Sequence, residues 1–352
     1  MTEPAITVVP FDLKSAAHDE YAALHAFTSR IHEELQPDDP PTPLEEAIAA
    51  WRGIMGVVNV RVWLARAADG RVVGRGQLVT ANTPENQHLA EGTIQVLPER
   101  RRQGLARGFL GRFVERLRAE RRRLVISNTI ARAPSGEALM ERLGGERGLE
   151  THVNQLKLEG LDRELLERWL AEGRSRGAEF ELGLWEGPHP EADLPAIAEL
   201  YEIMNTAPLG TLALEKQRVT PQMLRQMEAA IFARGTVRWT LVVRERSSGR
   251  FAGFTEAHWR PNAPQLLTQG NTGVFPEFRG RRLGRWLKAA MLEKVLRDRP
   301  EARFVRSSNA DSNAAMLRIN LELGFRPYLS RTIWQTEIEK IEAYLGGPGR
   351  EG

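Results

Sequence analysis

Two short stretches of this 352-residue chain contain residue types that suit the binding of a phosphorylated ligand. The first reads VLPERRRQGLA over residues 96–106, and the second reads VFPEFRGRRLG over residues 274–284. In each stretch a Pro stops strand pairing, and an Arg-rich loop with small residues leads into a helical pattern. Unpaired N–H groups at a helix start can cradle an anion, because small side chains let a ligand approach the backbone. Each stretch is therefore predicted to hold a diphosphate.

The elements around the two loops repeat in the same order. A predicted hairpin over residues 60–80 turns at an Asp-Gly pair, and another over residues 238–259 turns at a Ser-Gly pair. After each loop come a helical pattern, a short strand and a second helix that ends in Leu-Gly. Helical segments also precede both hairpins, and Thr42 and Thr220, each followed by Pro, are predicted helix N-caps. The chain thus contains the same order of elements twice: three strands, a loop, a helix, a strand and a helix.

Length agrees with this duplication, because one hydrophobic core rarely keeps growing over 352 residues. The hydrophobic share of 41% and the charged share of 27% are those of a globular protein. We expect an α/β fold with an N-terminal domain at 1–160, a linker helix at 161–178 and a C-terminal domain at 179–352.

Several classes of protein are not expected. No apolar run is long enough for a membrane helix, and the first residues lack the regions of a signal peptide, which predicts a cytoplasmic protein. The chain has no Cys, which excludes disulfides, thiolate catalysis and Cys-ligated zinc. No His pair lies at ligand spacing beside a carboxylate, so no metal site is expected. The Arg runs suit phosphate groups, but they lack interleaved aromatic residues, which argues against nucleic-acid binding.

The first loop resembles the acyl-CoA diphosphate loop of the GNAT N-acyltransferase superfamily. That loop follows Val-x-Pro and has the pattern Arg/Gln-x-x-Gly-x-Gly/Ala, which Arg101, Gly104 and Ala106 fit. In the second copy Arg279 and Gly284 fit, but Arg282 replaces the middle Gly, where its side chain could crowd a phosphate or bind it. The later stretch NADSNAAMLRINLELGF is similar to another helix of the superfamily. The resemblance covers nearly the whole chain, which looks like the bacterial tandem GNAT proteins.

This resemblance implies an α/β fold with an α+β mixed sheet in each of two tandem GNAT-like domains, splayed to admit the pantetheine arm of acetyl-CoA. It implies a cofactor site in the first half at Val96, Arg101, Arg102, Gln103, Gly104, Leu105 and Ala106. In the second half the corresponding residues are Val274, Arg279, Gly280, Arg281, Arg282, Leu283, Gly284 and Asn313. It also implies direct attack by the primary amine of a small molecule or peptide, helped by a Glu base, a strand N–H and a Tyr acid, without a metal.

Two carboxylates are candidates for the base. Glu91 comes just before the strand at residues 93–96, with a solvated loop carboxylate as the alternative interpretation. Glu256 shares a strand face with Phe254, and an inward Glu there indicates a base, an amine-binding group or a structural ion pair. Carboxylates are absent at Gln269 and Asn271, which can orient a substrate but cannot take its proton.

The acid is harder to find, because Met140 and Asn320 stand at the two positions where the superfamily usually has Tyr. Met cannot donate a proton, and Asn can only donate a hydrogen bond. Tyr328 is the nearest phenol and the best acid candidate, with simple packing as the alternative. His152 is the corresponding candidate in the first half.

The two halves therefore divide the expected features, with the better phosphate loop in the first and the better polar cleft in the second. Acyl-CoA binding by the first half alone, by the second alone or by both stays open. So does a non-catalytic acyl-CoA sensor or scaffold, because Tyr is missing at both positions. The expected partner is an amine acceptor, cationic if the carboxylates of QPDDPP contact it, with no nucleic acid or membrane. The protein is expected to be a monomer or a homodimer.

Overall fold

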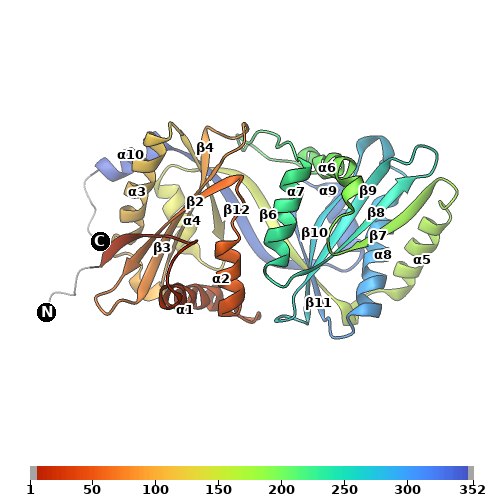
Figure 1. The fold of residues 1–352 in the computed structure, drawn as a ribbon, viewed down its shortest axis with the longest axis horizontal. Coiled ribbons are helices and arrows are strands. Elements are labelled where there is room, and N and C mark those ends of the chain that lie inside the picture. Colours follow the sequence, from red (N-terminus) through yellow and green to blue (C-terminus); the bar gives the residue numbers. More distant parts are fainter. Residues whose placement is uncertain (1–5, 348–352) are drawn as a thin grey trace. The chain divides into compact units, whose positions relative to one another are not determined.

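The computed structural model describes residues 6–347, and the chain divides into two compact units. The first unit consists of Met1–Glu150, Leu209–Glu215 and Arg331–Gly352, and the second consists of Thr151–Pro208 and Lys216–Ser330. Each unit holds one half of the strand order of a 12-stranded sheet and has its own hydrophobic core (Figure 1).

The first unit has a mixed sheet in the order β1-β2-β3-β4-β5-β12, in which only β4 and β5 run parallel. Its elements are β1 (Thr7–Phe11), α1 (His18–Leu35), α2 (Leu44–Arg52), β2 (Val58–Arg66), β3 (Val72–Ala81), β4 (Leu89–Val96), α3 (Leu105–Ala119), β5 (Leu124–Ile130), α4 (Pro134–Arg142), the end of β12 (Arg326–Glu337) and α10 (Ile338–Gly346).

The second unit has the corresponding order β6-β11-β10-β9-β8-β7, with β10 and β11 parallel. Its elements are most of β6 (Glu146–Lys157), α5 (Arg163–Arg174), β7 (Phe180–Glu186), α6 (Leu194–Tyr201), α7 (Pro221–Phe232), β8 (Val237–Glu245), β9 (Phe251–Trp259), β10 (Leu266–Val274), α8 (Leu283–Asp298), β11 (Phe304–Ala310), α9 (Ala314–Glu322) and the start of β12.

The compact units differ from the domain ranges expected from the sequence. Residues 151–157 of β6 pair with β11 in the second unit, and residues 331–337 of β12 pair with β5 in the first. The segment Leu209–Glu215 also belongs to the first unit. Each unit thus takes its last sheet strand from the half of the sequence that mainly builds the other. A strand edge must be paired, but hydrophobic alternation does not specify which distant strand pairs with it.

The helix expected as a linker is α5, and it packs within the second unit. Trp169 and Leu170 of α5 are buried in one cluster with Trp286 of α8, and a Cβ at Gly173 would overlap the Trp286 ring. One predicted helix cap also differs: Thr220 caps α7 through its hydroxyl, whereas Pro43, not Thr42, is the N-cap of α2.

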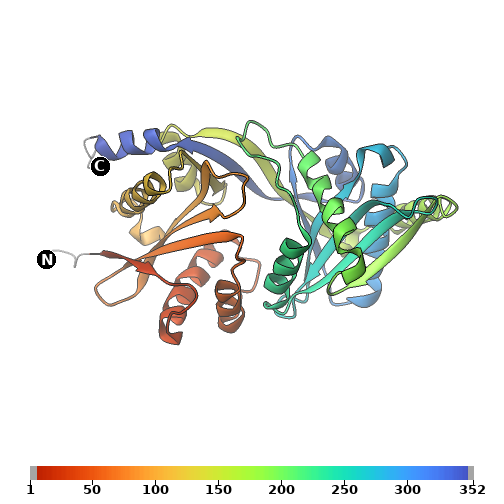
Figure 2. The ribbon, with the colours of Figure 1, turned by 45° about the horizontal axis from the view of Figure 1, so that its top comes forward.

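Helices cover both faces of each sheet. In the first unit α3 lies on one face, where a Cβ at Gly76 would come within 2.6 Å of the Phe109 ring, and α1 and α2 lie on the other (Figure 2). In the second unit α5 and α8 share one buried cluster with alternate residues of β8, while α6 and α7 share another with Val242 and Phe254. The two faces of β10 are therefore lined by different helices.

Candidate functional site

The parallel strand pair in each unit separates partway along its length. Pairing of β4 with β5 ends at Glu91, although β4 continues to Val96. Pairing of β10 with β11 ends at Gln269, although β10 continues to Val274. Each splayed pair leaves unpaired strand edges that lead to a loop and the N-terminus of a helix, α3 or α8. An extended arm that carries amide groups could bind along such edges.

The two loops have the same backbone conformation but place glycine differently. In the first, Arg102 and Gly104 have φ angles of 63° and 80°. In the second, Gly280 and Arg282 have φ angles of 78° and 63°. Alternate left-handed residues before a helix turn successive N–H groups toward one point, which suits an anion. The predicted passage from strand to helix is thus present in both copies.

The first Arg of each loop ties the loop to its own unit. Nε of Arg101 donates to the Val96 carbonyl at 3.1 Å, and its guanidinium pairs with Glu34 at 2.5 Å. Nε of Arg279 donates to the Val274 carbonyl at 3.0 Å. Its Nη2 donates to the Thr206 hydroxyl at 2.8 Å. These two predicted cofactor residues therefore hold the loop in shape.

In the second loop, Arg281 and Arg282 pair with acidic residues beside the loop. Arg282 pairs with Glu172 of α5 at 2.7 Å, and Arg281 lies 3.6 Å from Glu179. The Arg281 guanidinium also lies over the Phe180 ring. Since Arg282 is held toward α5, its side chain is drawn away from the loop centre rather than across it.

A β-bulge in β10 of the second unit has no counterpart in β4 of the first. The register of β10 against β9 shifts between Gln269 and Thr272, so that Gly270 and Asn271 both lie opposite Glu256. The corresponding pairing of β4 with β3 is regular from Glu91 to Val96. A bulge leaves backbone groups outside the ladder, where an N–H can bind a carbonyl oxygen.

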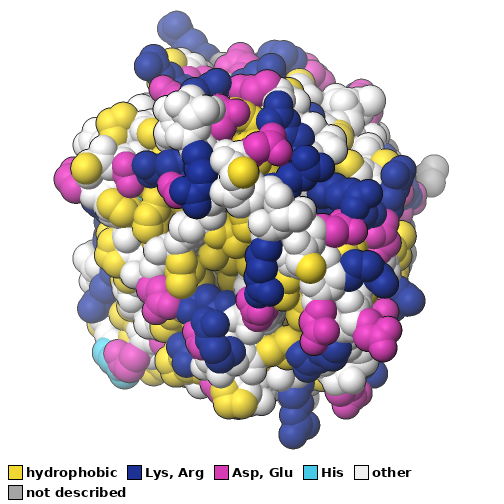
Figure 3. Space-filling model, turned by 90° about the vertical axis from the view of Figure 1, so that its right-hand side faces the viewer, with side chains coloured by type: hydrophobic (Ala, Val, Ile, Leu, Met, Phe, Trp, Pro, Cys, Tyr) yellow, Lys and Arg dark blue, Asp and Glu magenta, His cyan; other side chains and the backbone are white. Residues whose placement is uncertain are grey.

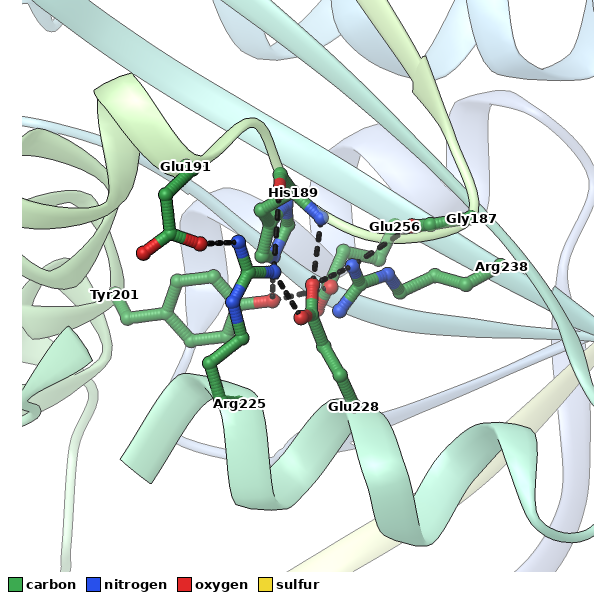
Figure 4. Close-up of polar contacts among 8 residues, drawn as sticks. All are labelled: Gly187, His189, Glu191, Tyr201, Arg225, Glu228, Arg238 and Glu256. Atoms are coloured by element: carbon green, nitrogen blue, oxygen red, sulfur yellow. Dashed lines mark hydrogen bonds and ion pairs between the residues drawn. The ribbon is translucent and has the colours of Figure 1, made fainter. Parts of the chain in front are cut away.

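Glu256 lies behind this bulge, in a buried network that Figure 4 shows. The Tyr201 hydroxyl donates to its carboxylate at 2.5 Å, and His189 Nε2 lies 3.2 Å from that hydroxyl. Burial raises the pKa of Glu256, while hydrogen bonds from Tyr201 and Asn271 oppose this rise. Within residues 6–347 Glu256 has no ion-pair partner, so the predicted structural ion pair is not formed. With 3% exposure, it supports the bulge from behind.

The ion pairs of this network belong to Glu228 of α7. Glu228 pairs with Arg238 at 2.6 Å and with Arg225 at 2.5 Å, and Arg225 also pairs with Glu191. The backbone N–H of His189 donates to Glu228 at 2.6 Å. Burial and the nearby Arg238 lower the pKa of His189 to about 4, so its ring is neutral at neutral pH.

Glu91 has a very different environment on β4. Its side chain is exposed, and no other residue in the described part of the chain bonds or pairs with it. Partial desolvation nevertheless raises the pKa of its carboxyl. Arg75 of β3, opposite Gln95, is also without an acidic partner among residues 6–347, and burial lowers its pKa to about 10. Sequence reasoning missed Arg75, which stands in an ordinary strand pattern.

The acid candidates lie in different places. Asn320 is buried on α9, where its Oδ1 accepts from the Lys288 ammonium at 2.6 Å. Tyr328 stacks with Arg306, with the guanidinium 3.9 Å from its ring. Arg306 alternates along β11 with Val305, which packs in the α8 cluster, so the Arg306 side chain points away from α8.

The structure gives His152 and Asn313 positions and contacts that the sequence did not predict. The sequence predicts His152 as an acid of the first half, but the residue lies in the second unit, 2.5 Å from Asp311. That assignment was wrong because β6 crosses from one unit to the other. Asn313 is the N-cap of α9, and its side chain accepts from the Met316 N–H at 3.3 Å.

Surface charge is mixed where Arg is abundant. Figure 3 shows Lys and Arg side chains standing among Asp and Glu on one face of the molecule. No helix among residues 6–347 is long and apolar enough to cross a membrane. In the same residues, no group of three or more His, Asp or Glu is arranged to hold a metal ion.

Comparisons with known proteins point to one superfamily. Residues 26–144 match the model of the acetyltransferase (GNAT) family. A tandem GNAT protein from the clavulanic acid biosynthesis pathway is 25% identical, with 98% of this chain and 100% of that chain covered and a TM-score of 0.76. No curated protein matches the sequence.

Two more distant structures share the fold alone. A GCN5-related N-acetyltransferase from Sphaerobacter thermophilus is 17% identical over 94% of this chain and 96% of its own, with a TM-score of 0.64. A putative acetyltransferase from Pyrococcus horikoshii is 14% identical over 94% and 89%, with a TM-score of 0.55. The predicted α/β tandem fold with a mixed sheet is confirmed, although the strands form one 12-stranded sheet and not a separate sheet in each half.

Proposed function

Because this chain belongs to the GNAT superfamily as a tandem protein, we propose that it is an N-acetyltransferase that uses acetyl-CoA. The superfamily consists of acyl-CoA N-acyltransferases. The acceptor is a primary amine of a small molecule or peptide, which attacks the thioester directly. We propose the second unit as the site of transfer, in a cytoplasmic monomer or homodimer.

One observation carries this assignment. In the second unit alone, a splayed strand pair, an anion-binding loop and a β-bulge occur along the same strand, β10. The loop and the N-terminus of α8 would hold the diphosphate, and Arg279 would keep the loop in place. The bulge at Gly270 and Asn271 would present an N–H to the thioester carbonyl as it becomes an oxyanion.

Glu256 then acts as a positioning residue, because it is buried and hydrogen-bonded to Tyr201 and Asn271. Its carboxylate would hold Asn271 so that the bulge keeps its shape while charge develops on the carbonyl oxygen. A preformed arrangement of this kind lowers the barrier, since nothing has to reorganise during the reaction.

The test is turnover by the full chain with acetyl-CoA and a panel of amines, with CoA release as the readout. We expect Gly270→Val to abolish transfer, because a side chain there would collide with Glu256 and His258. The matched variant Gly92→Ala in the first unit would contact Val125 and Phe113, away from the proposed site. If folded Gly270→Val and folded Gly92→Ala lost turnover equally, the proposal that transfer occurs in the second unit would be contradicted.

A second candidate is transfer in the first unit, favoured by Glu91. Its exposed, unpartnered carboxylate has a raised pKa, which suits a base that removes a proton from an amine. Glu91→Gln would then remove most activity, and Gly270→Val would leave it unchanged. If acetyl-CoA binds but no amine releases CoA, the non-catalytic sensor is the better assignment.

A further inference from the structure

A buried polar cluster on the α8 side of the second sheet has no part in the mechanism given so far. Lys288 is 1% exposed, and its Nζ donates to Gln269 Oε1 at 2.7 Å and to Asn320 Oδ1 at 2.6 Å. Asn320 in turn donates through Nδ2 to Asn309 Oδ1 at 2.6 Å. The cluster thus connects α8 and α9 with both strands of the splayed pair.

The ammonium of Lys288 is buried among neutral groups. Besides the two amide oxygens, it lies 5.5 Å from the centre of the Phe325 ring. Burial lowers the pKa of Lys288 to about 7, and no charged group contributes to the shift. An ammonium has three N–H donors, and the described part of the chain supplies acceptors for two of them.

Charged groups on the neighbouring elements are directed elsewhere. Glu172 of α5 pairs with Arg282, and Glu322 of α9 pairs with Arg285. The nearest titratable groups on β9, Glu256 and His258, alternate with Ala257, which packs toward α8, so they lie on the opposite face. Of the other basic residues on these elements, Lys294 pairs with Glu186 and Asp298, Arg306 bonds with Gln155, and Arg318 is exposed.

The first unit shows that the fold itself does not need this cluster. Leu110 of α3 and Met140 of α4 hold the positions that correspond to Lys288 and Asn320, and both are buried in the apolar core. A lone buried ammonium destabilises a protein relative to an apolar residue of similar size. The polar pair in the second unit is therefore better explained by function than by packing.

The cluster lies where the two parallel strands part. Gln269, which accepts from Lys288, is the last residue of β10 that pairs with β11. From Gly270 to Val274 the strand runs on for about 16 Å before the loop, at about 3.3 Å per residue. A coenzyme with its diphosphate in the loop and its pantetheine arm between the strands would place its sulfur near this fork.

We propose that Lys288 and Asn320 form the site that stabilises and protonates the CoA thiolate, an inference that rests on the proposed acyl transfer. The acceptor amine forms the C–N bond as the C–S bond breaks, and the bonding electrons pass to sulfur. Lys288 gives one proton to the thiolate, which leaves as CoA thiol. The neutral amine of Lys288 then regains a proton from solvent. The acceptor releases its own proton to solvent, so the protons balance. Asn320 is held by Lys288 with its amide directed into the cluster.

The test measures the pKa of the thiol of bound CoA, and it needs no acceptor. Thiolate absorbance would be titrated from about pH 6 to about pH 10 in the full chain with Ala106→Trp, which blocks the first loop. We expect thiolate to form below about pH 7, where Lys288 keeps its proton, which places the bound thiol pKa more than about one unit below that of free CoA. In Lys288→Leu with Asn320→Met, which copies the first unit, the pKa should return to that of free CoA.

A second variant separates charge from proton transfer. Lys288→Arg keeps a cation that does not release its proton, so the bound thiol pKa should stay low while turnover falls at least about tenfold. An unshifted thiol pKa in the parent protein, or the same shifted value in the folded Leu and Met variant, would overturn the inference. A shifted thiol pKa without turnover on any amine would refute the proposed function and leave the thiolate site standing.

Discussion

The two Arg-rich loops, residues 96–106 and 274–284, reach the same backbone conformation from different residues. The first has Arg102 and then Gly104 in the left-handed region, and the second has Gly280 and then Arg282 there. Glycine takes such angles with little strain, whereas Arg does so at a cost of about 1 kcal/mol. Each loop therefore has one favourable and one strained position. The anion cradle depends on the alternation of backbone angles, which one glycine in either place can maintain.

The surroundings of the loops differ more than the loops do. The first unit has a regular β4, an unpartnered Glu91 and an apolar pair, Leu110 and Met140, beneath the splayed strands. The second has a bulge backed by Glu256 and the Lys288 cluster beneath the fork. Both copies have thus kept the loop conformation that we propose for holding a coenzyme, while the polar groups that we propose to act on a thioester are concentrated in the second.

The largest expected effect comes from blocking each loop in turn. Ala106→Trp and Gly284→Trp place the same large ring at corresponding positions near the start of α3 and α8. At Gly284 the ring would also meet Ile319, since even a Cβ would lie 3.5 Å from that side chain. Calorimetric titration with acetyl-CoA should show at least about hundredfold weaker binding in the altered unit, or about 2.7 kcal/mol. If the heat of acetyl-CoA binding were unchanged in both variants, neither loop would be the acetyl-CoA site.

The Lys288 cluster predicts an opposition between stability and activity. Lys288→Leu with Asn320→Met should raise the free energy of unfolding by about 1–4 kcal/mol while lowering turnover. Folded Lys288 loses its proton near pH 7, but the unfolded side chain keeps it to near 10.5, so stability of the parent rises with pH between these values.

The stability gain of this double variant should therefore be largest below pH 7 and should shrink toward pH 10. Urea unfolding at several pH values measures it. A gain that does not change with pH would mean that Lys288 is not a buried ammonium in solution.

Tyr201→Phe should destabilise the protein by about 1–3 kcal/mol, because it removes the hydroxyl that donates to the buried Glu256 carboxylate. The loss should diminish on acidification as Glu256, whose pKa is raised, takes up a proton. Tyr21→Phe is the matched control in the first unit, where a buried hydroxyl donates to the neutral Leu13 carbonyl at 2.8 Å. Equal, pH-independent losses in thermal unfolding would contradict the special role of Glu256.

The smallest expected effect is an exchange of loop residues. Arg282→Gly relieves a strained angle but loses an exposed pair with Glu172, so it should stabilise by less than about 1 kcal/mol. Gly104→Arg should destabilise by about 1 kcal/mol for the same steric reason. Thermal unfolding measures both. If Arg282→Gly destabilised the protein, the ion pair with α5 would be the stronger contribution.

Local sequence signals were enough to locate most of the secondary-structure elements of this protein. Turn residues, helical periodicity and the Val-x-Pro loops located the repeated elements, because each depends on residues close together in the chain. The loop residues from Arg101 to Ala106 and from Arg279 to Gly284 were found in this way. The duplication followed from the same signals, whereas the mixed sheet was implied only by the resemblance to the GNAT superfamily.

Only the tertiary structure decided which residues share a site. The exchange of β6 and β12 moved His152 into the second unit, and no local pattern specifies pairing between strands so far apart in the chain. Lys288 stood in an ordinary helical pattern until α9 brought Asn320 within 2.6 Å of it. Burial and charge depend on neighbours from distant segments, so the sequence located the two Arg-rich loops while the fold distributed the polar groups around them.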